Sequence, residues 1–287
     1  MPHMLNRSKF LLTLTLAALT GCATGTPTAS TADPMVYVVN YSQEFGTLDL
    51  ATGAFVQIGQ PLPEGSQGLV PGPGGSLLTL TFSGNLEAIT PATGGAKVIG
   101  PTGLGGNANN LAELGSTVYA TDLSNNLYTV NTTTGLATLI GATGMPADEA
   151  FTPPSNSDGS INLFDETLFA VGGELYATFD EWSLGANGYS IDPSPSDPYI
   201  SPVLYQINPQ TGVATVISST TWRLTASVVV NGIVYSCQGT PSAAHPLPAP
   251  YLSVDTLNLT DGITTVISPF SAPALADGPI GGAWPVP

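Results

Sequence analysis

Polar and apolar residues alternate along the stretch from 126 to 141, on both sides of the pair Thr134-Gly135. A period of two residues is typical of β-strands, in which successive side chains point to opposite faces. Glycine adopts the positive φ that a short reversal requires, and the side chain of Asn131 can hydrogen-bond the backbone of the turn. The stretch therefore predicts a β-hairpin whose turn runs from Asn131 to Gly135.

Four other stretches repeat this turn in diverged form. They are Asp49–Gly53, Thr90–Gly94, Asn208–Gly212 and Asn258–Gly262, and all but the second begin with Asp or Asn. A second apolar strand precedes each turn and carries, in chain order, Tyr37, Leu78, Tyr119, Tyr176 or Tyr235. From this residue to the turn glycine the numbering advances by 16 in the first three repeats, by 36 in the fourth and by 27 in the fifth. The equal spacings indicate a repeated structural unit, and the larger ones indicate insertions.

Two-residue turn sequences precede the second strand of four units. Gly74-Gly75, Gly115-Ser116, Gly172-Gly173 and Asn231-Gly232 are pairs that favour tight hairpins. Four strands in a period of about 41 residues are typical of a β-propeller blade. The first repeat lacks its leading strand, and residues 279–285 follow the last hairpin, so we expect the C-terminal strand to join the first blade and close the ring. The sequence predicts an all-β, five-bladed β-propeller over residues 35–287.

The best-preserved repeat, Leu127-Tyr128-Thr129-Val130-Asn131 followed by Thr134-Gly135 and Ile140-Gly141, resembles a pattern found in uncharacterised bacterial β-propeller lipoproteins. Their repeats read Leu-Tyr-x-Val-Asn-x-x-Thr-Gly-x-x-Thr-x-Ile-Gly. The resemblance covers Val36 to Pro287 and implies the propeller fold in a secreted or envelope protein with a binding role. It implies no particular activity.

The N-terminus has the features of an export signal. Two basic residues precede an apolar run from 10 to 19, which is too short to span a bilayer as a mature helix. The run ends in Leu19-Thr20-Gly21-Cys22, which resembles the lipobox of bacterial lipoproteins. That resemblance implies a signal peptide over 1–21, acylation of Cys22 and, because Ala23 follows, export to an outer membrane on its periplasmic or surface side. Residues 22–34, rich in Thr, Ala and Ser, are expected to form a flexible tether. An ordinary, unlipidated signal peptide is the alternative.

Charge and cysteine content narrow the possible partners. The chain has 20 acidic and 4 basic residues, a formal charge of −16. Two basic residues lie in the leader, so the mature chain would carry 2 minus 20, or −18. Phosphate binding requires clustered Lys and Arg, which excludes nucleic acid as a partner. With Cys22 acylated, Cys237 is expected to be a small buried hydrophobe without a disulfide partner.

The surplus residues form three segments, near 145–160, 180–200 and 239–250. In an up-and-down blade, the connections from second to third strand and from fourth strand to the next blade leave from one face, so these segments should share a face. Long connections in compact domains are often functional. The candidate ligand-binding residues on them are Asp180, Glu181, Trp182, Tyr189, Tyr199 and His245. Their rings could stack on sugars and their carboxylates could bond hydroxyls, but the same residues would also suit a solvated rim.

Motifs for metal, cofactor or triad chemistry are missing from the sequence. It contains no Asp-x-Asp-x-Asp-Gly calcium loop and no phosphate-binding loop. His245 is the one histidine outside the leader, which excludes His-based triads and two-His metal sites. We therefore expect neither a metal nor a cofactor.

These observations favour a non-enzymatic envelope protein, held to the lipid bilayer by acylated Cys22, that binds a glycan, peptide or protein through the face with the three segments. A carbohydrate-active enzyme is the main alternative, with Glu113, Asp165 and Glu166 as candidate acids near the central funnel. A structural scaffold lipoprotein is the third. Two carboxylates that converge in the funnel would favour the enzyme, whereas a funnel lined by Val, Leu, Thr and Gly would count against it.

Overall fold

The computed structural model describes residues 34–145, 161–184, 190–191, 203–220, 224–238, 253–269 and 280–287, with the backbone alone for 161–166, 180–184, 190–191 and 238. The leader, Cys22 and the predicted tether up to residue 33 lie outside this part of the chain. Contacts set Asp33–Pro287 apart as one compact unit. Within the described ranges no helix is long and apolar enough to cross a membrane.

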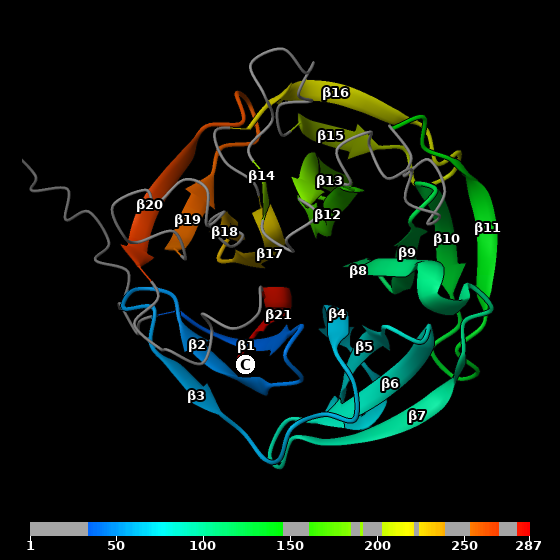
Figure 1. Ribbon diagram of the computed structural model, residues 1–287, viewed down its shortest axis with the longest axis vertical. Helices are drawn as coiled ribbons and strands as arrows, with labels where there is room; N and C mark the ends of the chain where they lie inside the picture. The colour runs from blue at the N-terminus through cyan, green and yellow to red at the C-terminus, as the bar shows by residue number, and fades with distance from the viewer. Residues whose placement is uncertain are drawn as a thin grey trace, which may run out of the picture. The chain divides into compact units, whose positions relative to one another are not determined.

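Five antiparallel sheets follow one another around a ring (Figure 1). Blade 1 consists of β21 (Ile280–Pro285), β1 (Met35–Asn40), β2 (Phe45–Asp49) and β3 (Phe55–Gln57). Blade 2 consists of β4 (Ser66–Pro71), β5 (Leu77–Thr81), β6 (Asn85–Thr90) and β7 (Gly95–Pro101), and blade 3 of β8 (Ala108–Leu114), β9 (Thr117–Asp122), β10 (Asn126–Val130) and β11 (Ala137–Ala142). Blade 4 consists of β12 (Ile161–Val171), β13 (Glu174–Leu184), β15 (Val203–Ile207) and β16 (Ala214–Ser219), with the short β14 (Ser190–Ile191) paired to β13. Blade 5 consists of β17 (Leu224–Val230), β18 (Ile233–Gln238), β19 (Ser253–Leu257) and β20 (Thr264–Pro269), and the 3-10 turns η1 (Pro73–Gly75) and η2 (Gly105–Asn107) lie in connections.

The C-terminal strand closes the ring, as the sequence predicts. β21 is antiparallel to β1, with Val36 opposite Pro285 and Val39 opposite Gly282. It is the innermost strand of blade 1 and lies between β17 and β4, the innermost strands of blades 5 and 2. The first and last parts of the domain thus share one sheet, so the inner edge of β1 is paired rather than open.

The predicted turns form by the expected chemistry. The Asn131 Oδ1 atom accepts the amides of Thr133 and Thr134 at 2.9 and 3.0 Å, and the Gly135 amide bonds the Asn131 carbonyl at 2.7 Å. Asp49, Asn208 and Asn258 make equivalent side-chain bonds. All five turn glycines have positive φ, from 68° at Gly53 to 85° at Gly135. Glycine is required there because L side chains disfavour that region.

The tight turns between first and second strands agree with the prediction in three of the four blades that have one. Gly115-Ser116, Gly172-Gly173 and Asn231-Gly232 each join two strands directly. The prediction of a two-residue turn at Gly74-Gly75 was wrong. β4 ends at Pro71 and β5 begins at Leu77, so the reversal takes five residues and includes η1. Pro73 fixes a helical φ at the start of this turn and so lengthens it.

A contact between neighbouring blades explains the last glycine of the repeat. A Cβ atom added to Gly141 on β11 would lie 2.5 Å from the Thr211 carbonyl, and one added to the turn residue Gly212 would lie 2.8 Å from the Gly141 carbonyl. Gly100 and Gly135 make the same reciprocal approach between blades 2 and 3. The outer strand of one blade therefore touches the turn of the next, backbone to backbone, and a side chain at either position would separate them.

The hydrophobic core lies between the blades. One cluster joins blades 1 and 2 through Val39, Phe45, Leu69, Leu77 and Ile89, and similar clusters fill the other interfaces. Cys237 is buried among the residues between blades 5 and 1, as expected for a small hydrophobe.

A polar residue caps the connection that follows the second strand in blades 1 to 3. The side chains of Asn40, Thr81 and Asp122 accept the amides of Glu44, Asn85 and Asn126 at 2.7, 3.1 and 2.9 Å. In blade 4 the equivalent position holds Phe179, which is buried and offers no cap. β13 continues past it to Leu184, five residues beyond its last pairing with β15, and stays paired with β12 throughout.

Candidate functional site

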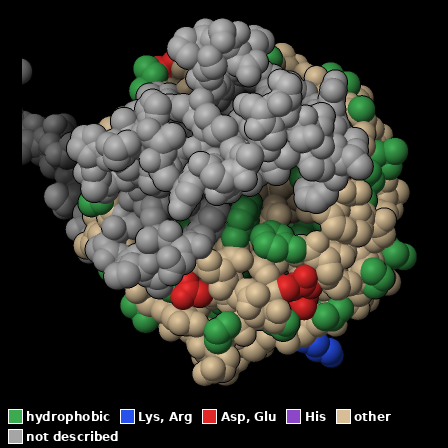
Figure 2. All heavy atoms as spheres, viewed as in Figure 1, with side chains coloured by type: hydrophobic (Ala, Val, Ile, Leu, Met, Phe, Trp, Pro, Cys, Tyr) green, Lys and Arg blue, Asp and Glu red, His purple; other side chains and the backbone are tan. Residues whose placement is uncertain are grey.

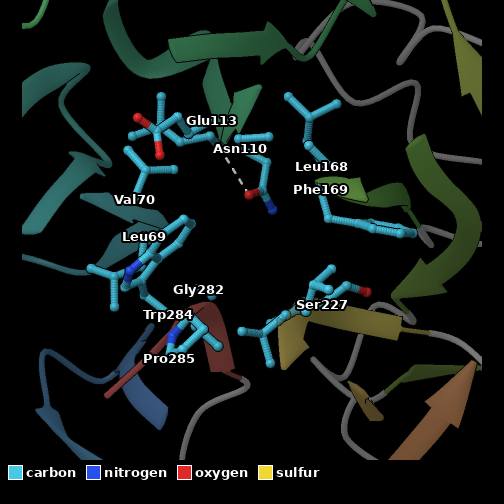
Figure 3. A pocket seen from close by; sticks show the side chains of 18 residues that line it. Leu69, Val70, Asn110, Glu113, Leu168, Phe169, Ser227, Gly282, Trp284 and Pro285 are labelled. Carbon is cyan, nitrogen blue, oxygen red and sulfur yellow. Dashed lines mark hydrogen bonds between the residues drawn. The ribbon is translucent and has the colours of Figure 1, made fainter. Parts of the chain in front are cut away.

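The innermost strands of all five blades enclose a central cavity of about 80 Å³. Its walls come from β4, β8, β12, β17 and β21, and are built mainly of Leu, Val, Ala and Gly (Figure 3). Pockets that enclose a small-molecule ligand usually measure roughly 300–1,000 Å³. The cavity has room for a few water molecules and is too small for a sugar ring.

The polar groups of the cavity are sparse. Asn110 is 5% exposed, and Figure 3 shows its amide pointing toward the middle of the cavity. The Asn110 Oδ1 atom accepts the Leu111 amide at 2.9 Å, which fixes the orientation of the side chain. Glu113 lies at the edge of the cavity in the same view, and partial burial raises the pKa of its carboxyl above the ordinary value.

A row of hydroxyl groups leads from the cavity into the interface of blades 4 and 5. Ser227, which lines the cavity, lies 2.9 Å from the Ser236 hydroxyl and 3.4 Å from the Thr167 hydroxyl, and Thr167 lies 2.8 Å from Thr178. Each hydroxyl has a partner, so the row is a satisfied part of the core.

The described cavity lacks the pair of acids that glycoside hydrolysis requires. Glu113 is the one carboxylate among the described side chains that line it. Asp165 and Glu166 lie on β12, opposite Asp180 and Phe179 of β13, and their side chains are outside the described set. The described walls therefore resemble a funnel lined by apolar residues more than a glycosidase funnel with two converging carboxylates.

The strands that flank the three inserted segments end on one face of the ring. The segments follow β11, β13 and β18, and the chain resumes at β12, β15 and β19. Each gap is a connection from second to third strand or from one blade to the next, so the antiparallel order puts all six strand ends on one face, termed the insertion face. The tight turns are on the other, termed the turn face.

A β-ribbon extends blade 4 at the insertion face. β12 and β13 have 11 residues each, whereas the innermost strands of the other blades have six or seven. The paired backbone of 161–166 and 180–184 extends about 16 Å beyond the last residue that pairs with β15.

The structure places the backbone of three of the six predicted ligand-binding residues. Asp180, Glu181 and Trp182 lie on the β13 half of the ribbon, opposite Asp165, Phe164 and Leu163. Tyr189, Tyr199 and His245 lie outside the described residues, as do most of the residues of the three segments. The described part of the insertion face carries few charges, and Figure 2 shows mostly uncharged side chains there.

Sequence reasoning missed two buried acids that replace the tyrosine of the repeat. Tyr128 occupies that position in blade 3, where it donates a hydrogen bond to Asp122 at 2.8 Å, and burial with this bond raises its pKa to about 12. The same position holds Glu87 in blade 2 and Asp255 in blade 5, which are 3% and 0% exposed. The signal that could have revealed them is an acid after an apolar strand residue, as in Leu86-Glu87 and Val254-Asp255, at a position where other repeats have Tyr.

The comparisons with known proteins concern the fold alone. No family model and no curated protein sequence matches the chain. A similar solved structure is that of a protein of unknown function from Bacteroides caccae, with 13% identity, a TM-score of 0.47, and coverage of 89% of this chain and 99% of that one. A second is a catalytically inactive virginiamycin B lyase from Staphylococcus aureus with quinupristin, with 15% identity, a TM-score of 0.40, and coverage of 85% of this chain and 69% of that one. A third is the PQQ-bound aldose sugar dehydrogenase of Streptomyces coelicolor, with 13% identity, a TM-score of 0.34, and coverage of 61% of this chain and 57% of that one. At these scores and identities they say nothing about function.

Proposed function

We propose that this propeller is a non-enzymatic binding protein of the bacterial cell envelope that takes a glycan, peptide or protein on its insertion face. The observation that carries the proposal is the asymmetry between the two faces. All three surplus connections begin and end on the insertion face, and the β12–β13 ribbon extends from it, whereas the turn face has short reversals. Binding residues gather on long connections of rigid scaffolds.

The central cavity supports binding over hydrolysis. A glycosidase needs two carboxyl groups within roughly 5–10 Å of each other and space for a sugar between them. Glu113 is the one carboxylate among the described side chains of the cavity, and the cavity volume is about 80 Å³. No described feature favours the carbohydrate-active enzyme, and recognition would occur on the outer surface of the insertion face.

The proposed anchor is a lipid on Cys22, at an outer membrane on its periplasmic or surface side. Two or more acyl chains hold a protein stably to a bilayer, whereas the folded domain offers few cations for anionic lipids. Lys97 is the one basic residue in the described ranges. Nucleic acid is not a proposed partner for the same reason.

Changing Cys22 to alanine should move the protein from the membrane fraction to the soluble fraction. The thiol is the acylation site, so the variant would lose all of its anchoring chains. Immunoblots of fractionated cells measure the shift, with Cys237→Ala as the control because Cys237 is buried in the domain. Membrane retention of the Cys22 variant would contradict lipidation.

Removing the β13 half of the ribbon, together with the segment that follows it, should weaken ligand binding at least tenfold. Phe179 lies opposite Val203, so residues 180–202 can be replaced by Asn-Gly, which closes a two-residue hairpin at that pair. The measurement compares signals of the 31–287 fragment and this variant on a glycan array and in pull-downs from envelope extract. We expect at least a tenfold loss of the retained signal.

The control for this experiment changes the opposite face. Leu136 and Val213 are exposed on the turn face, and their replacement by serine should leave binding unchanged. Loss of partner recovery with the control and not with the ribbon variant would reverse the assignment of the face. Recovery that neither variant changes would favour the structural scaffold.

A further inference from the structure

Two aromatic side chains occupy equivalent places on the insertion face of blades 1 and 2. Tyr41 follows Asn40, the capping residue at the end of β1. Phe82 follows Thr81, the capping residue at the end of β5. The two rings meet edge to face, with centroids 5.1 Å apart and 78° between the ring planes, which is a favourable arrangement for an aromatic pair. Phe82 is nevertheless 39% exposed, so part of it is open to a ligand on this face.

Glycine backbone lies against both rings. A Cβ atom added to Gly65 would lie 2.3 Å from Cε2 of Phe82, and one added to Gly281 would lie 2.8 Å from Cε1 of Tyr41. Any larger residue at either place would displace a ring, because these contacts leave no room for a methyl group. The Phe82 amide also donates a hydrogen bond to the Gly65 carbonyl at 3.1 Å. The packing therefore fixes the position of the Phe82 ring, although the residue is exposed.

A carboxylate is held next to the Phe82 ring. Ser83 donates its hydroxyl to Oε1 of Glu64 at 2.6 Å and its amide to Oε2 at 3.0 Å. Because Ser83 follows Phe82 and Glu64 precedes Gly65, two consecutive residues of one connection contact two consecutive residues of the other. This double contact sets the carboxylate beside the ring. Each carboxylate oxygen can accept more than one hydrogen bond, so Glu64 still has acceptor sites for a ligand.

Glu64 is ionised at neutral pH, and cations that could neutralise it are scarce. Burial would raise the pKa of Glu64, but the hydrogen bonds from Ser83 and Thr81 outweigh it and hold that pKa below the ordinary value. Lys97 is the one basic residue in the described ranges, and it lies exposed on β7, the outer strand of blade 2. The chain as a whole has a formal charge of −16, and a charge of this size draws cationic ligands toward the surface. An ionised carboxylate beside an exposed ring therefore favours a ligand group that is positively charged and can stack.

Arginine meets both requirements. Its guanidinium is planar, stacks on aromatic faces and presents a fork of N–H donors that fits a carboxylate. The lysine ammonium is a compact and strongly hydrated point charge, so it would pair with Glu64 without stacking on Phe82. A neutral sugar could stack on the ring, but the acidic chain would not attract it.

We propose that Phe82 and Glu64, with Tyr41 supporting the ring, form an arginine site that recognises a basic segment of a polypeptide partner. The guanidinium stacks on Phe82 and donates hydrogen bonds to the Glu64 carboxylate, whose remaining acceptor sites are available beside the ring. The inference rests on the proposed binding function of the insertion face. It narrows the ligand class from a glycan, peptide or protein to a polypeptide with an accessible arginine.

The test is the binding of a dye-labelled hexa-arginine peptide to the 31–287 fragment, which contains the whole compact unit. Fluorescence anisotropy measures it at physiological ionic strength, where distant charges are screened. Hexa-arginine should bind about threefold more tightly than hexa-lysine, which has the same charge but does not stack. Glu64→Gln should weaken hexa-arginine binding about fivefold, because glutamine has nearly the same shape and no charge. Phe82→Leu should weaken it about threefold and remove the preference for arginine, because leucine has no π face.

Glu174→Gln is the matched control. Glu174 is exposed on the turn face, at the start of β13, and its substitution removes the same charge as Glu64→Gln does. This variant should bind hexa-arginine as the native fragment does. Thermal unfolding checks that each variant is folded, and Glu64→Gln alone decides the test if Phe82→Leu is not.

Several results would overturn the arginine site. Equal affinities of the Glu64→Gln and Glu174→Gln variants would show that the peptide responds only to the overall charge. Equal binding of hexa-arginine and hexa-lysine to the native fragment would exclude a stacked guanidinium. A neutral glycan that the native fragment binds on an array, that Phe82→Leu loses and that Glu64→Gln keeps would assign the ring to a sugar.

The arginine site and the broader binding function can fail separately. The replacement of residues 180–202 leaves Glu64 and Phe82 in place, so hexa-arginine binding should survive it. Partner recovery that depends on the ribbon, together with hexa-arginine binding that does not depend on Glu64, would remove the arginine site and leave the proposed function standing. Recovery that neither the ribbon variant nor Glu64→Gln reduces would count against the binding function itself.

Discussion

Changing Gly282 to alanine should be among the most destabilising single substitutions in the domain, with a loss of about 3 kcal/mol in the free energy of unfolding. Gly282 lies on β21, opposite Val39 of β1. A Cβ atom there would meet the backbone of Gly68 and lie 2.7 Å from the Leu69 nitrogen on β4. Both are main-chain atoms of a neighbouring blade, so the clash is relieved only if the closing strand moves away from β4.

Urea unfolding measures the loss, and a thermal midpoint about 10 °C lower should accompany it. Hydrogen exchange adds a local readout. Amides of β1 should lose protection before those of β9, because the ring opens where the closing strand β21 meets β4. Gly106→Ala is the matched control, since its added Cβ would lie 3.5 Å from the nearest atom, the Phe82 carbonyl oxygen. Equal unfolding midpoints for the two variants would mean that the contact between β21 and β4 tolerates a methyl group.

Changing Glu87 to glutamine should stabilise the protein at pH 8 by about 2 kcal/mol, because it replaces a buried carboxylate with a neutral group of the same shape. The native carboxyl has a raised pKa in the folded state, so the folded protein holds its proton more tightly than the unfolded chain does. The stability that this provides is complete below the ordinary value of 4.5 and is lost as the pH rises through the raised folded pKa.

The difference between variant and native protein should therefore be small at pH 4 and grow toward pH 8. Chemical unfolding at four or five pH values gives this curve. Glu174→Gln is the control. Glu174 is exposed on β13, so the difference in unfolding free energy between this variant and the native protein should not change with pH. A pH-independent gain for Glu87→Gln would show that the buried group does not titrate on folding.

The blade units were predictable because their determinants are local. Asn131 and Gly135 are four residues apart, and Asn131 accepts the amides of Thr133 and Gly135 within that span, so the turn needs no distant partner. Ring closure was predictable from a missing strand at one end and a spare strand at the other. The Gly74-Gly75 turn was mispredicted because Pro73 changes the turn conformation next to an otherwise standard pair.

The site was less predictable because its parts are far apart in the chain. The three long segments could be assigned to one face from strand counting alone, but the 11-residue β12–β13 ribbon could not, since it depends on pairing across 161–184. Glu113 was a candidate catalytic acid because it lies near a predicted first strand. In the structure it is the single carboxylate among the described side chains that line a small cavity. Glu87 was passed over, because an acid in a half-apolar strand is usually on the solvent side.

By itself, the sequence determined the repeat, the strand order and the turn geometry of this protein, because period-two alternation and side-chain bonds to the nearest backbone act over a few residues. Only the tertiary structure decided which side chains meet between blades. Ser66 and Gly281 are separated by most of the domain, and they touch because the C-terminal strand returns to the first blade. Whether an acid is solvated or buried depends on what the next blade presents to it, and that is settled when the ring closes.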